Sequence, residues 1–343
     1  NTAVGNHALL ANTTGANNTA VGALAGDALT TASYNVALGY LALSTETAGQ
    51  ESVAIGSQAL ATQNVGSGAV YNTAVGTSAG RLITTGIQNT LIGGLAGDAF
   101  NTSNYNTAVG FGALSSDTKG ERSTAVGQEA LGSQNFTSTT VTGNTALGFQ
   151  TGRLLTTGTF NTIVGHEAGT VVTTGLYNNL FGALAGDALT VGSANAVMGW
   201  GALTSDTQGS NSVAIGHAAL GSQNFTSATA AYNTAVGSNA GGAVTTGVQN
   251  TFVGGLAGDA VTSGSYNVAT GYGAYNTAVG YFALGANTTS TAQTAVGYNA
   301  LRLATGHYNT ALGYEASGSN TTGVENVAIG ANAAANNTSG GSN

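Results

Sequence analysis

A five-residue motif of the form Asn-Thr-Ala-Val-Gly recurs twenty times along the chain, and most copies begin 17 residues apart. The copies begin at Asn1, Asn18, Asn35, Ser52, Asn72, Asn89, Asn106, Ser123, Asn144, Asn161, Asn178, Asn195, Ser212, Asn233, Asn250, Asn267, Asn276, Gln293, Asn309 and Asn326. A fixed short period without helix-length segments is typical of a solenoid, in which each repeat forms one coil stacked on the last. The sequence therefore predicts an all-β protein, a parallel β-solenoid with coils of about 17 residues.

Side chains alternate along the motif, as they do in a short strand. The fourth position is aliphatic in nearly every copy, and we expect this row to point into the coil. The third position is usually Ala, and we expect that row to face a second packing surface, where changes of size must be matched. The enlarged third-position residues are Leu91, Ile163, Leu180, Val197 and Phe252.

The first and fifth positions of the motif predict specific backbone features. Gly at the fifth position, as in Gly5 and Gly22, indicates a tight turn because glycine tolerates a positive φ. Asn at the first position predicts a stacked amide ladder with one rung per coil. The chain has no proline, which fits backbone N–H groups that are committed to hydrogen bonds between coils.

A longer repeat is superimposed on the coils. Each motif copy that begins with Ser is followed by a gap of 20 or 21 residues, so four coils form a module, and a third module carries one extra coil. The additional residues cannot stay in register, and we expect them to bulge as loops. The module is also marked by the sequence Leu-Ala-Gly-Asp-Ala at Leu24–Ala28, Leu95–Ala99, Leu184–Ala188 and Leu256–Ala260.

One irregularity divides the chain. The copies at Asn267 and Asn276 begin only 9 residues apart, so half a coil is missing there. We expect a kink or a changed cross-section near Gly271–Tyr275. The predicted domains are a solenoid over residues 1–275 and its continuation over residues 276–343.

Composition excludes several classes of function. The 343 residues include 13 acidic and 5 basic side chains, for a net charge of −8, so the basic footprint of a nucleic-acid-binding protein is missing. There is no cysteine for a disulfide framework or a thiolate metal site. No apolar run is long enough to span a membrane, and we expect no membrane insertion in this segment. Because the chain begins and ends within the repeat pattern, we expect it to be part of something longer.

Catalytic and metal-binding patterns are weak. The four histidines, His7, His166, His217 and His307, show no ligand spacing, and no nucleophile motif or phosphate-binding loop is present. We therefore expect neither an enzyme nor a bound cofactor. One exception concerns the module aspartates, which in a trimer could converge and bind Ca²⁺ through oxygen ligands; the alternative is that each one caps its local turn. These residues are Asp27, Asp98, Asp187 and Asp259.

Two rows of aromatic residues could stack on sugar rings or, alternatively, cover coil edges and an interchain seam. One row precedes the motif, at Tyr34, Tyr71, Tyr105, Phe160, Tyr177, Tyr232, Tyr266 and Tyr308. The other follows its Gly, at Tyr40, Phe111, Phe149, Trp200, Tyr272, Tyr281, Tyr298 and Tyr314. Trp200, the only tryptophan, is the strongest single binding candidate in these rows.

The bulge loops are the other candidate contact points, because loops displayed on a rigid scaffold often carry binding. Solvated spacer loops are the alternative. The candidate binding residues in these loops are Asn135, Phe136, Thr137, Asn224, Phe225 and Thr226.

The repeat resembles the head repeats of trimeric autotransporter adhesins, the YadA-like head. Ser52–Leu60, with the sequence Ser-Val-Ala-Ile-Gly-Ser-Gln-Ala-Leu, carries the resemblance most clearly, and Ser212–Leu220 is nearly as close. Longer repeats of phage tail-fibre proteins are similar to Asn309–Ala316. The resemblance implies a left-handed β-roll and an intertwined or side-by-side homotrimer. The coils here are longer than is typical of the adhesin heads, and the neck, coiled-coil stalk and membrane anchor are missing, which favours a tail fibre or free filament.

These observations predict an extracellular fibre or adhesin segment on a virion or cell surface. Its expected partners are copies of itself and a host cell-surface glycan or protein, with no nucleic acid. A purely structural extracellular filament is the first alternative. The second is an ice-binding solenoid, because rows of Thr exist, although Val36, Val53 and Val213 interrupt the second-position row.

Overall fold

The computed structural model describes residues 1–265, 267–271, 277–279, 283 and 293–342. The chain divides into two compact units, Asn1–Tyr177 and Asn178–Asn343. Every regular element of the described residues is a β-strand, and the strands pair in parallel about one coil apart. The predicted all-β parallel β-solenoid with coils of about 17 residues is thus confirmed.

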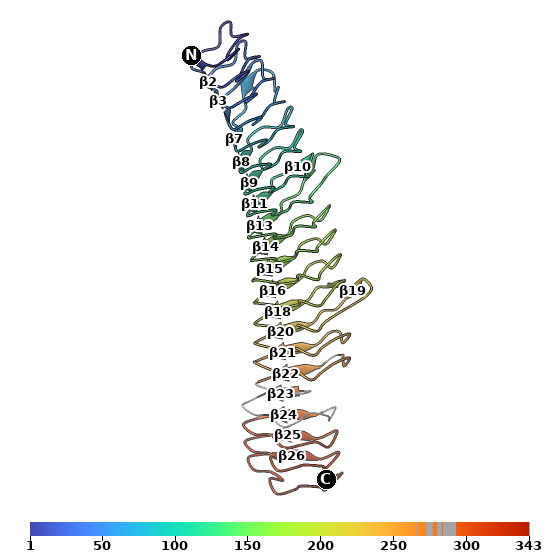
Figure 1. Ribbon diagram of the computed structural model, residues 1–343. Coiled ribbons are helices and arrows are strands. Elements are labelled where there is room, and N and C mark those ends of the chain that lie inside the picture. Colours follow the sequence, from blue (N-terminus) through green and yellow to red (C-terminus); the bar gives the residue numbers. More distant parts are fainter. Residues whose placement is uncertain (266, 272–276, 280–282, 284–292, 343) are drawn as a thin grey trace. The chain divides into compact units, whose positions relative to one another are not determined.

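Unit 1 is a ladder of three-residue strands, one from each motif copy (Figure 1). Neighbouring strands pair in register, so that Thr73 lies beside Thr90 and Thr90 beside Thr107. The strands are β1 (Thr2–Val4), β2 (Thr19–Val21), β3 (Val36–Leu38), β5 (Val53–Ile55), β7 (Thr73–Val75), β8 (Thr90–Ile92), β9 (Thr107–Val109), β11 (Thr124–Val126), β13 (Thr145–Leu147) and β14 (Thr162–Val164).

Unit 2 continues the same design in its own ladder. Its strands are β15 (Asn179–Phe181), β16 (Ala196–Met198), β18 (Val213–Ile215), β20 (Thr234–Val236), β21 (Thr251–Val253), β22 (Val268–Thr270), β23 (Thr277–Val279), β24 (Thr294–Val296), β25 (Thr310–Leu312) and β26 (Val327–Ile329). At the expected irregularity, β22 pairs with β23 and Thr270 lies opposite Val279. The ladder therefore continues where half a coil is missing; residues 272–276, with the expected kink and the boundary at 275, lie outside the described residues.

Three pairs of two-residue strands form short side ladders. They are β4 (Gly49–Gln50) with β6 (Gly68–Ala69), β10 (Gly120–Glu121) with β12 (Thr140–Val141), and β17 (Gly209–Ser210) with β19 (Thr229–Ala230). In each pair the second strand follows the extra residues of a long coil. The inserted residues therefore leave the coil and return to pair with the coil before, as the bulge prediction required.

The direction of the strand side chains corrects the sequence prediction. The third position of the motif faces the interior: Ala74 and Ala108 are fully buried, and so are the enlarged Leu91 and Phe252. The fourth position faces outward, and Ile92 is 41% exposed. The expectation that the aliphatic fourth row fills the coil was wrong, because a 17-residue coil has room for an alanine on this wall but not for a continuous row of Val and Leu.

The interior is filled by one large side chain at a time. In some coils a Leu, such as Leu114, occupies the ninth position and is fully buried. In others that position is Gly and the twelfth position is large, as in Gly97 with Phe100. A Cβ on Gly97 would lie 2.8 Å from the Phe100 ring and 2.9 Å from Leu91, so the glycine makes room for both. A large side chain at the twelfth position is therefore accompanied by glycine at the ninth position, so the volume inside the coil stays similar.

The predicted amide ladder is present and buried. Asn72 Oδ1 accepts hydrogen bonds from the backbone N–H of Asn89 (2.9 Å) and from its Nδ2 (3.2 Å). Asn89 Oδ1 receives the backbone N–H of Asn106 in the same way (3.0 Å), and Asn89 Nδ2 also donates to the carbonyl of Ser103 (2.8 Å). The amide of each Asn thus forms hydrogen bonds with backbone groups and amides of neighbouring coils. Because its polar atoms have partners, the amide can be buried.

The fifth-position glycines bring adjacent coils into close contact. Gly93 has a φ of +133°, and a Cβ built on it would lie 2.5 Å from the carbonyl oxygen of Gly110. The seventh position also has a positive φ, yet it accepts larger residues such as Leu41 (+55°) and Gln58 (+60°). Conformation alone therefore does not select glycine at the fifth position; the close approach of the next coil does.

Two neighbouring glycines separate these causes. At Gly199 (φ +138°) a Cβ would overlap the carbonyl of Gly216, whereas at Gly201 (φ +59°) no atom lies within 4 Å. We expect Gly201→Ala to cost about 1–2 kcal/mol, for the left-handed backbone alone, and Gly199→Ala about 3 kcal/mol or more, because two coils must separate. Guanidinium chloride unfolding measures both. Equal losses of stability would contradict the close-contact explanation.

Candidate functional site

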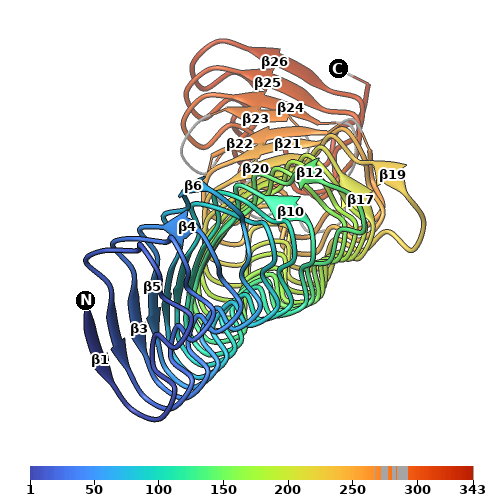
Figure 2. The same ribbon diagram turned by 90° about the horizontal axis from the view of Figure 1, so that it is seen from above.

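The long coils project loops from the regular stack, and Figures 1 and 2 show the segment that leads to β19 extending past the coils beside it. The loops lie between Gln134 and β12 in unit 1 and between Gln223 and β19 in unit 2. Asn135 and Thr137 are exposed in the first loop, and Asn224 and Thr226 in the second. These four sequence-predicted residues therefore stand on the surface.

The aromatic residues of the same loops, in contrast, are buried. Phe136 is 7% exposed and Phe225 is 6% exposed, so both rings pack against their own coil. Their role as contact residues stays a prediction, and in the single chain neither ring stands on the surface. A buried aromatic ring contributes large apolar area to a thin core, which is a structural role in holding the loop down.

A buried carboxylate anchors each loop. Asp117, on the coil before the loop, is fully buried and accepts backbone N–H groups of Gly120 (3.0 Å) and Phe136 (3.2 Å) at Oδ1. Its Oδ2 accepts Gln134 Nε2 at 2.6 Å, and Gln134 Oε1 accepts Asn144 Nδ2 at 2.9 Å. The carboxylate thus connects its own turn, the start of the loop and the next coil, and it forms no ion pair with a cation of the described residues.

The same arrangement occurs at the other two long coils. Asp206 Oδ2 accepts Gln223 Nε2 (2.6 Å), and Asp206 Oδ1 accepts the backbone N–H of Phe225 (3.1 Å). Glu46 Oε2 accepts Gln63 Nε2 (3.2 Å). We call these three acid–glutamine pairs the loop anchors.

The loop anchors also explain why Ser replaces Asn at the start of each long coil. Ser123 has no amide to continue the ladder, and Gln134 supplies one: its Nε2 donates to Ser123 Oγ (3.2 Å) and its Oε1 receives Asn144 Nδ2 (2.9 Å). Sequence reasoning noticed the Ser copies and the long gaps but missed the anchors. The available signal was an acid followed 17 residues later by Gln, as in Asp117 and Gln134.

Aromatic residues of both predicted rows are exposed. Trp200 is 55% exposed, and its indole stacks on the ring of His217 in the next coil, with centroids 5.0 Å apart. In the row that precedes the motif, Phe160 stacks on Tyr177 (5.5 Å), and Arg122 lies 5.5 Å above the Tyr105 ring. Tyr266, Tyr272 and Tyr281 lie outside the described residues. The rows are therefore partly self-stacked, with ring faces still open to solvent.

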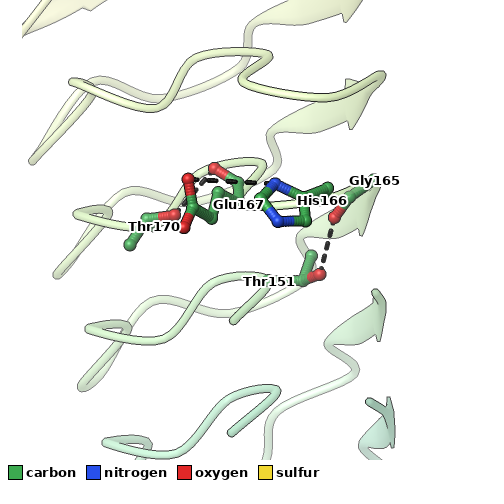
Figure 3. Close-up of polar contacts among 5 residues, drawn as sticks. All are labelled: Thr151, Gly165, His166, Glu167 and Thr170. Atoms are coloured by element: carbon green, nitrogen blue, oxygen red, sulfur yellow. Dashed lines mark hydrogen bonds and ion pairs between the residues drawn. The ribbon is translucent and has the colours of Figure 1, made fainter. Parts of the chain in front are cut away.

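Figure 3 shows the surroundings of His166 in unit 1. Its Nδ1 lies 3.8 Å from Glu167 Oε2, and its ring stacks on Phe149 with centroids 5.3 Å apart. Nearby, Thr170 Oγ1 donates to the Glu167 carbonyl (2.7 Å) and Thr151 Oγ1 to the Gly165 carbonyl (2.8 Å). Both hydroxyls donate to backbone carbonyls and not to the imidazole. Because His166 stacks on Phe149, it belongs to the row of exposed aromatic rings.

The module aspartates are partly buried turn residues within a single chain. Asp187 Oδ1 accepts Thr204 Oγ1 at 2.6 Å. Burial raises the pKa of Asp98, opposed by the nearby Arg81, and burial also raises the pKa of Asp259. Within the described part of the chain, no group of three His, Cys, Asp or Glu side chains is placed to hold a metal ion.

The outward face of the main strands forms a regular surface along each unit. It combines the second-position row, largely Thr, with the fourth-position row of Val, Ile and Leu. In unit 1, Ile92 and Leu147 are 41% and 47% exposed; in unit 2, Met198 and Leu312 are also exposed. Each unit therefore presents an outward strand face with a largely aliphatic fourth-position row, interrupted in unit 2 by Phe181 and Thr270, which we call the aliphatic face.

No protein-family model matches this chain, and no curated protein matches it. The likeness to YadA-like head repeats therefore stays a prediction. The described residues contain no helix long and apolar enough to cross a membrane.

The buried Asp117 makes stability depend on pH. Burial raises the pKa of this carboxyl above its ordinary value of 3.8, against the hydrogen bonds from Gln134 and backbone N–H groups. Because the folded chain holds the proton more tightly than the unfolded chain, the stabilising contribution of protonation is complete below the unfolded pKa and is lost as pH rises through the folded pKa.

We therefore expect the stability of the wild type, relative to Asp117→Asn, to fall as pH rises through and above 3.8. Denaturant unfolding of both proteins over a pH series measures this difference. Glu325→Gln, at an exposed carboxyl, is the control. A wild-type-to-variant difference that stays constant with pH would show that burial of this charge has no energetic consequence.

Proposed function

We propose that this chain is a non-enzymatic segment of an extracellular fibre that assembles with copies of itself and attaches to a host or cell surface. Its place would be a virion or a cell surface, as in a phage tail fibre or the head of a trimeric autotransporter adhesin. The support is the solenoid itself, the aliphatic face, the projecting loops and the exposed aromatic rows. No nucleic-acid partner is proposed, because the net charge is −8.

The observation that carries self-assembly is the aliphatic face. Ile92 and Leu147 in unit 1 are more than one third exposed in the single chain, and they belong to a row that is aliphatic in nearly every coil. Contiguous exposed apolar surface on a soluble protein marks an interaction site. A partner with the same repeat can cover it in register, since each coil then meets an identical coil. The resemblance to YadA-like heads supports three chains in a left-handed arrangement.

Assembly would also multiply weak contacts. Each chain displays two large loops, whose exposed residues include Thr137 and Thr226, and a trimer would display six. Avidity from several weak contacts exceeds the affinity of any one of them. The proposed partner is a host glycan or protein. A Ca²⁺ site would require module aspartates, such as Asp187, from three chains. We propose it only as a feature of the trimer.

We expect the native mass in solution to be three times 33.2 kDa. Ile92→Asp places a charge on the aliphatic face and should shift the protein toward monomer, because the carboxylate would be buried without a partner. Leu82→Asp is the matched control, since Leu82 is 38% exposed but lies off the strands. Sedimentation equilibrium measures all three proteins. A monomeric wild type would overturn the assembly proposal.

Attachment separates the adhesin from a purely structural filament. Replacing Thr137, Ser138 and Thr226 by Ala removes exposed loop side chains and leaves the loop anchors intact. An adhesin should lose at least about tenfold in binding of labelled protein to a panel of bacterial and animal cells, because each loop contact is repeated in the assembly. Thr85→Ala with Thr157→Ala, at exposed sites outside the long coils, is the control. Unchanged attachment of the loop variant would exclude these loops.

Ice binding is the second candidate, and one observation favours it. Six consecutive coils of unit 1 carry Thr at the second position of the motif, and this row lies on the outward strand face. Strand spacing of about 4.8 Å would array these hydroxyls regularly. The neighbouring aliphatic row fits a protein interface equally well. A solution whose freezing and melting temperatures coincide would remove this candidate.

A further inference from the structure

Unit 1 contains a surface groove beside Phe111, one residue of the exposed aromatic rows. It extends over the coils from Asn89 to Asn144 and has a volume of about 260 Å³. Its lining includes Leu95, Phe111, Ser115, Glu129, Gly132 and Arg153. This volume is near the lower end of ligand pockets, which span about 300–1,000 Å³. The groove therefore has the size for one ring-sized group.

The groove exists because side chains are missing along its floor. Gly132 holds the tenth position of its coil, where the next coil carries Arg153. Gly112 holds the seventh position, where the next coil carries Glu129. The seventh and tenth positions thus each lack a side chain in one of two adjacent coils. The side chains of Glu129 and Arg153, at the same positions of the next coils, line the groove.

Phe111 forms an open aromatic wall. It is 55% exposed, and the residue before it in its row is Gly94, so no ring is available from that coil. Across the described residues no aromatic ring stacks on Phe111, in contrast to Phe149, which stacks on His166. The ring lies close to Gly94, where an added Cβ would be 3.5 Å away, and the more than half of the side chain that stays exposed offers apolar surface to a ligand.

Glu129 and Arg153 supply the acceptor and the donor. Gln150 Nε2 donates to Glu129 Oε2 (2.9 Å), which orients the carboxylate and leaves its Oε1 without a side-chain donor among the described residues. Arg153 forms no ion pair with any described carboxylate, and its Nε is shielded from solvent without a hydrogen-bond partner. An unpaired guanidinium offers several fixed donors.

A related groove lies at the matching coils of unit 2, but different residues line it. It is lined by Thr204, Ala218, Gly221, Ser222 and Gly242, among others. In the matching coils, Ala218 stands where unit 1 has Glu129, and Gly242 stands where unit 1 has Arg153. The repeat therefore forms grooves in both units. A smaller groove in unit 2 is also lined by an arginine and a glutamate, Arg302 and Glu315, but no aromatic side chain lines it.

We infer that the groove at Phe111 binds a single pyranose ring of a neutral saccharide. The C–H face of the sugar would pack on the Phe111 ring, while Glu129 accepts from sugar hydroxyls and Arg153 donates to them. A few placed polar groups on a partly apolar pocket give orientation and specificity. A neutral sugar is favoured over an acidic one because Glu129 lies in the same groove and the chain carries −8. This inference rests on the proposed function and gives the ligand class.

The test uses the full chain and methyl glycosides of glucose, galactose, mannose and N-acetylglucosamine, with glucuronic acid as the acidic probe. Saturation-transfer NMR and titration give a dissociation constant, expected on the order of millimolar for one shallow site. Phe111→Ala, Glu129→Gln and Arg153→Gln should each weaken binding of the preferred glycoside at least about tenfold. Tyr105→Ala and Arg122→Gln, an exposed aromatic and an exposed arginine outside the groove, should leave it unchanged.

Thermal unfolding of each variant confirms that the substitution leaves the fold intact. No binding of any neutral glycoside would overturn the inference, and so would binding that survives all three groove substitutions. Binding of glucuronic acid alone, lost only in Arg153→Gln, would overturn the neutral-sugar assignment. The proposed function is tested separately by native mass and cell attachment, so a fibre that attaches to cells without binding a glycoside refutes the groove and not the fibre.

Discussion

Each coil is held to the next by hydrogen bonds that repeat at the same place in every turn. The short strands pair in parallel, the buried Asn amides bridge successive coils, and the fifth-position glycines let the backbones approach closely, as at Gly93 and Gly110. A solenoid has no large core to compensate for a mismatch between neighbours. Regular coil-to-coil spacing is therefore the condition for everything else, and it explains why the residues that repeat most strictly are Asn and Gly.

A small interior sets the second constraint. Because a 17-residue coil encloses little space, the chain places Ala along the strand wall and one larger side chain opposite it, such as Leu114 or Phe100. At Asp117, where the interior receives a carboxylate, both oxygens are used to hold a turn, a glutamine and a loop. Irregular loops are thus tolerated because a charged hydrogen-bond network, and not apolar packing alone, fixes their base.

For the proposed function, the consequence is that the candidate binding features lie outside the regularly repeated stack of coils. The projecting loops, the aromatic rows, the aliphatic face and the Phe111 groove use side chains that point outward, away from the interior and the buried amide ladder. Phe111 and Arg153 are permitted because their rows face solvent, where side chains change between coils without disturbing the spacing. This separation suits a fibre that keeps one scaffold and varies its surface.

The sequence by itself determined the coil length, the parallel ladder, the amide row and the glycine corners, because a strict period leaves only one way to stack equal coils. It did not determine which strand face is inside. The alternation of side chains along a strand defines two rows but does not say which row points into the coil. The volume that a closed coil can hold decides which row is inside. That limit puts Ala108 inside and Ile92 outside. Tertiary structure also decided that Phe136 is buried, because the loop returns over its own coil and Asp117 fixes its start. The groove beside Phe111 likewise depends on glycines and walls from coils that only stacking brings together.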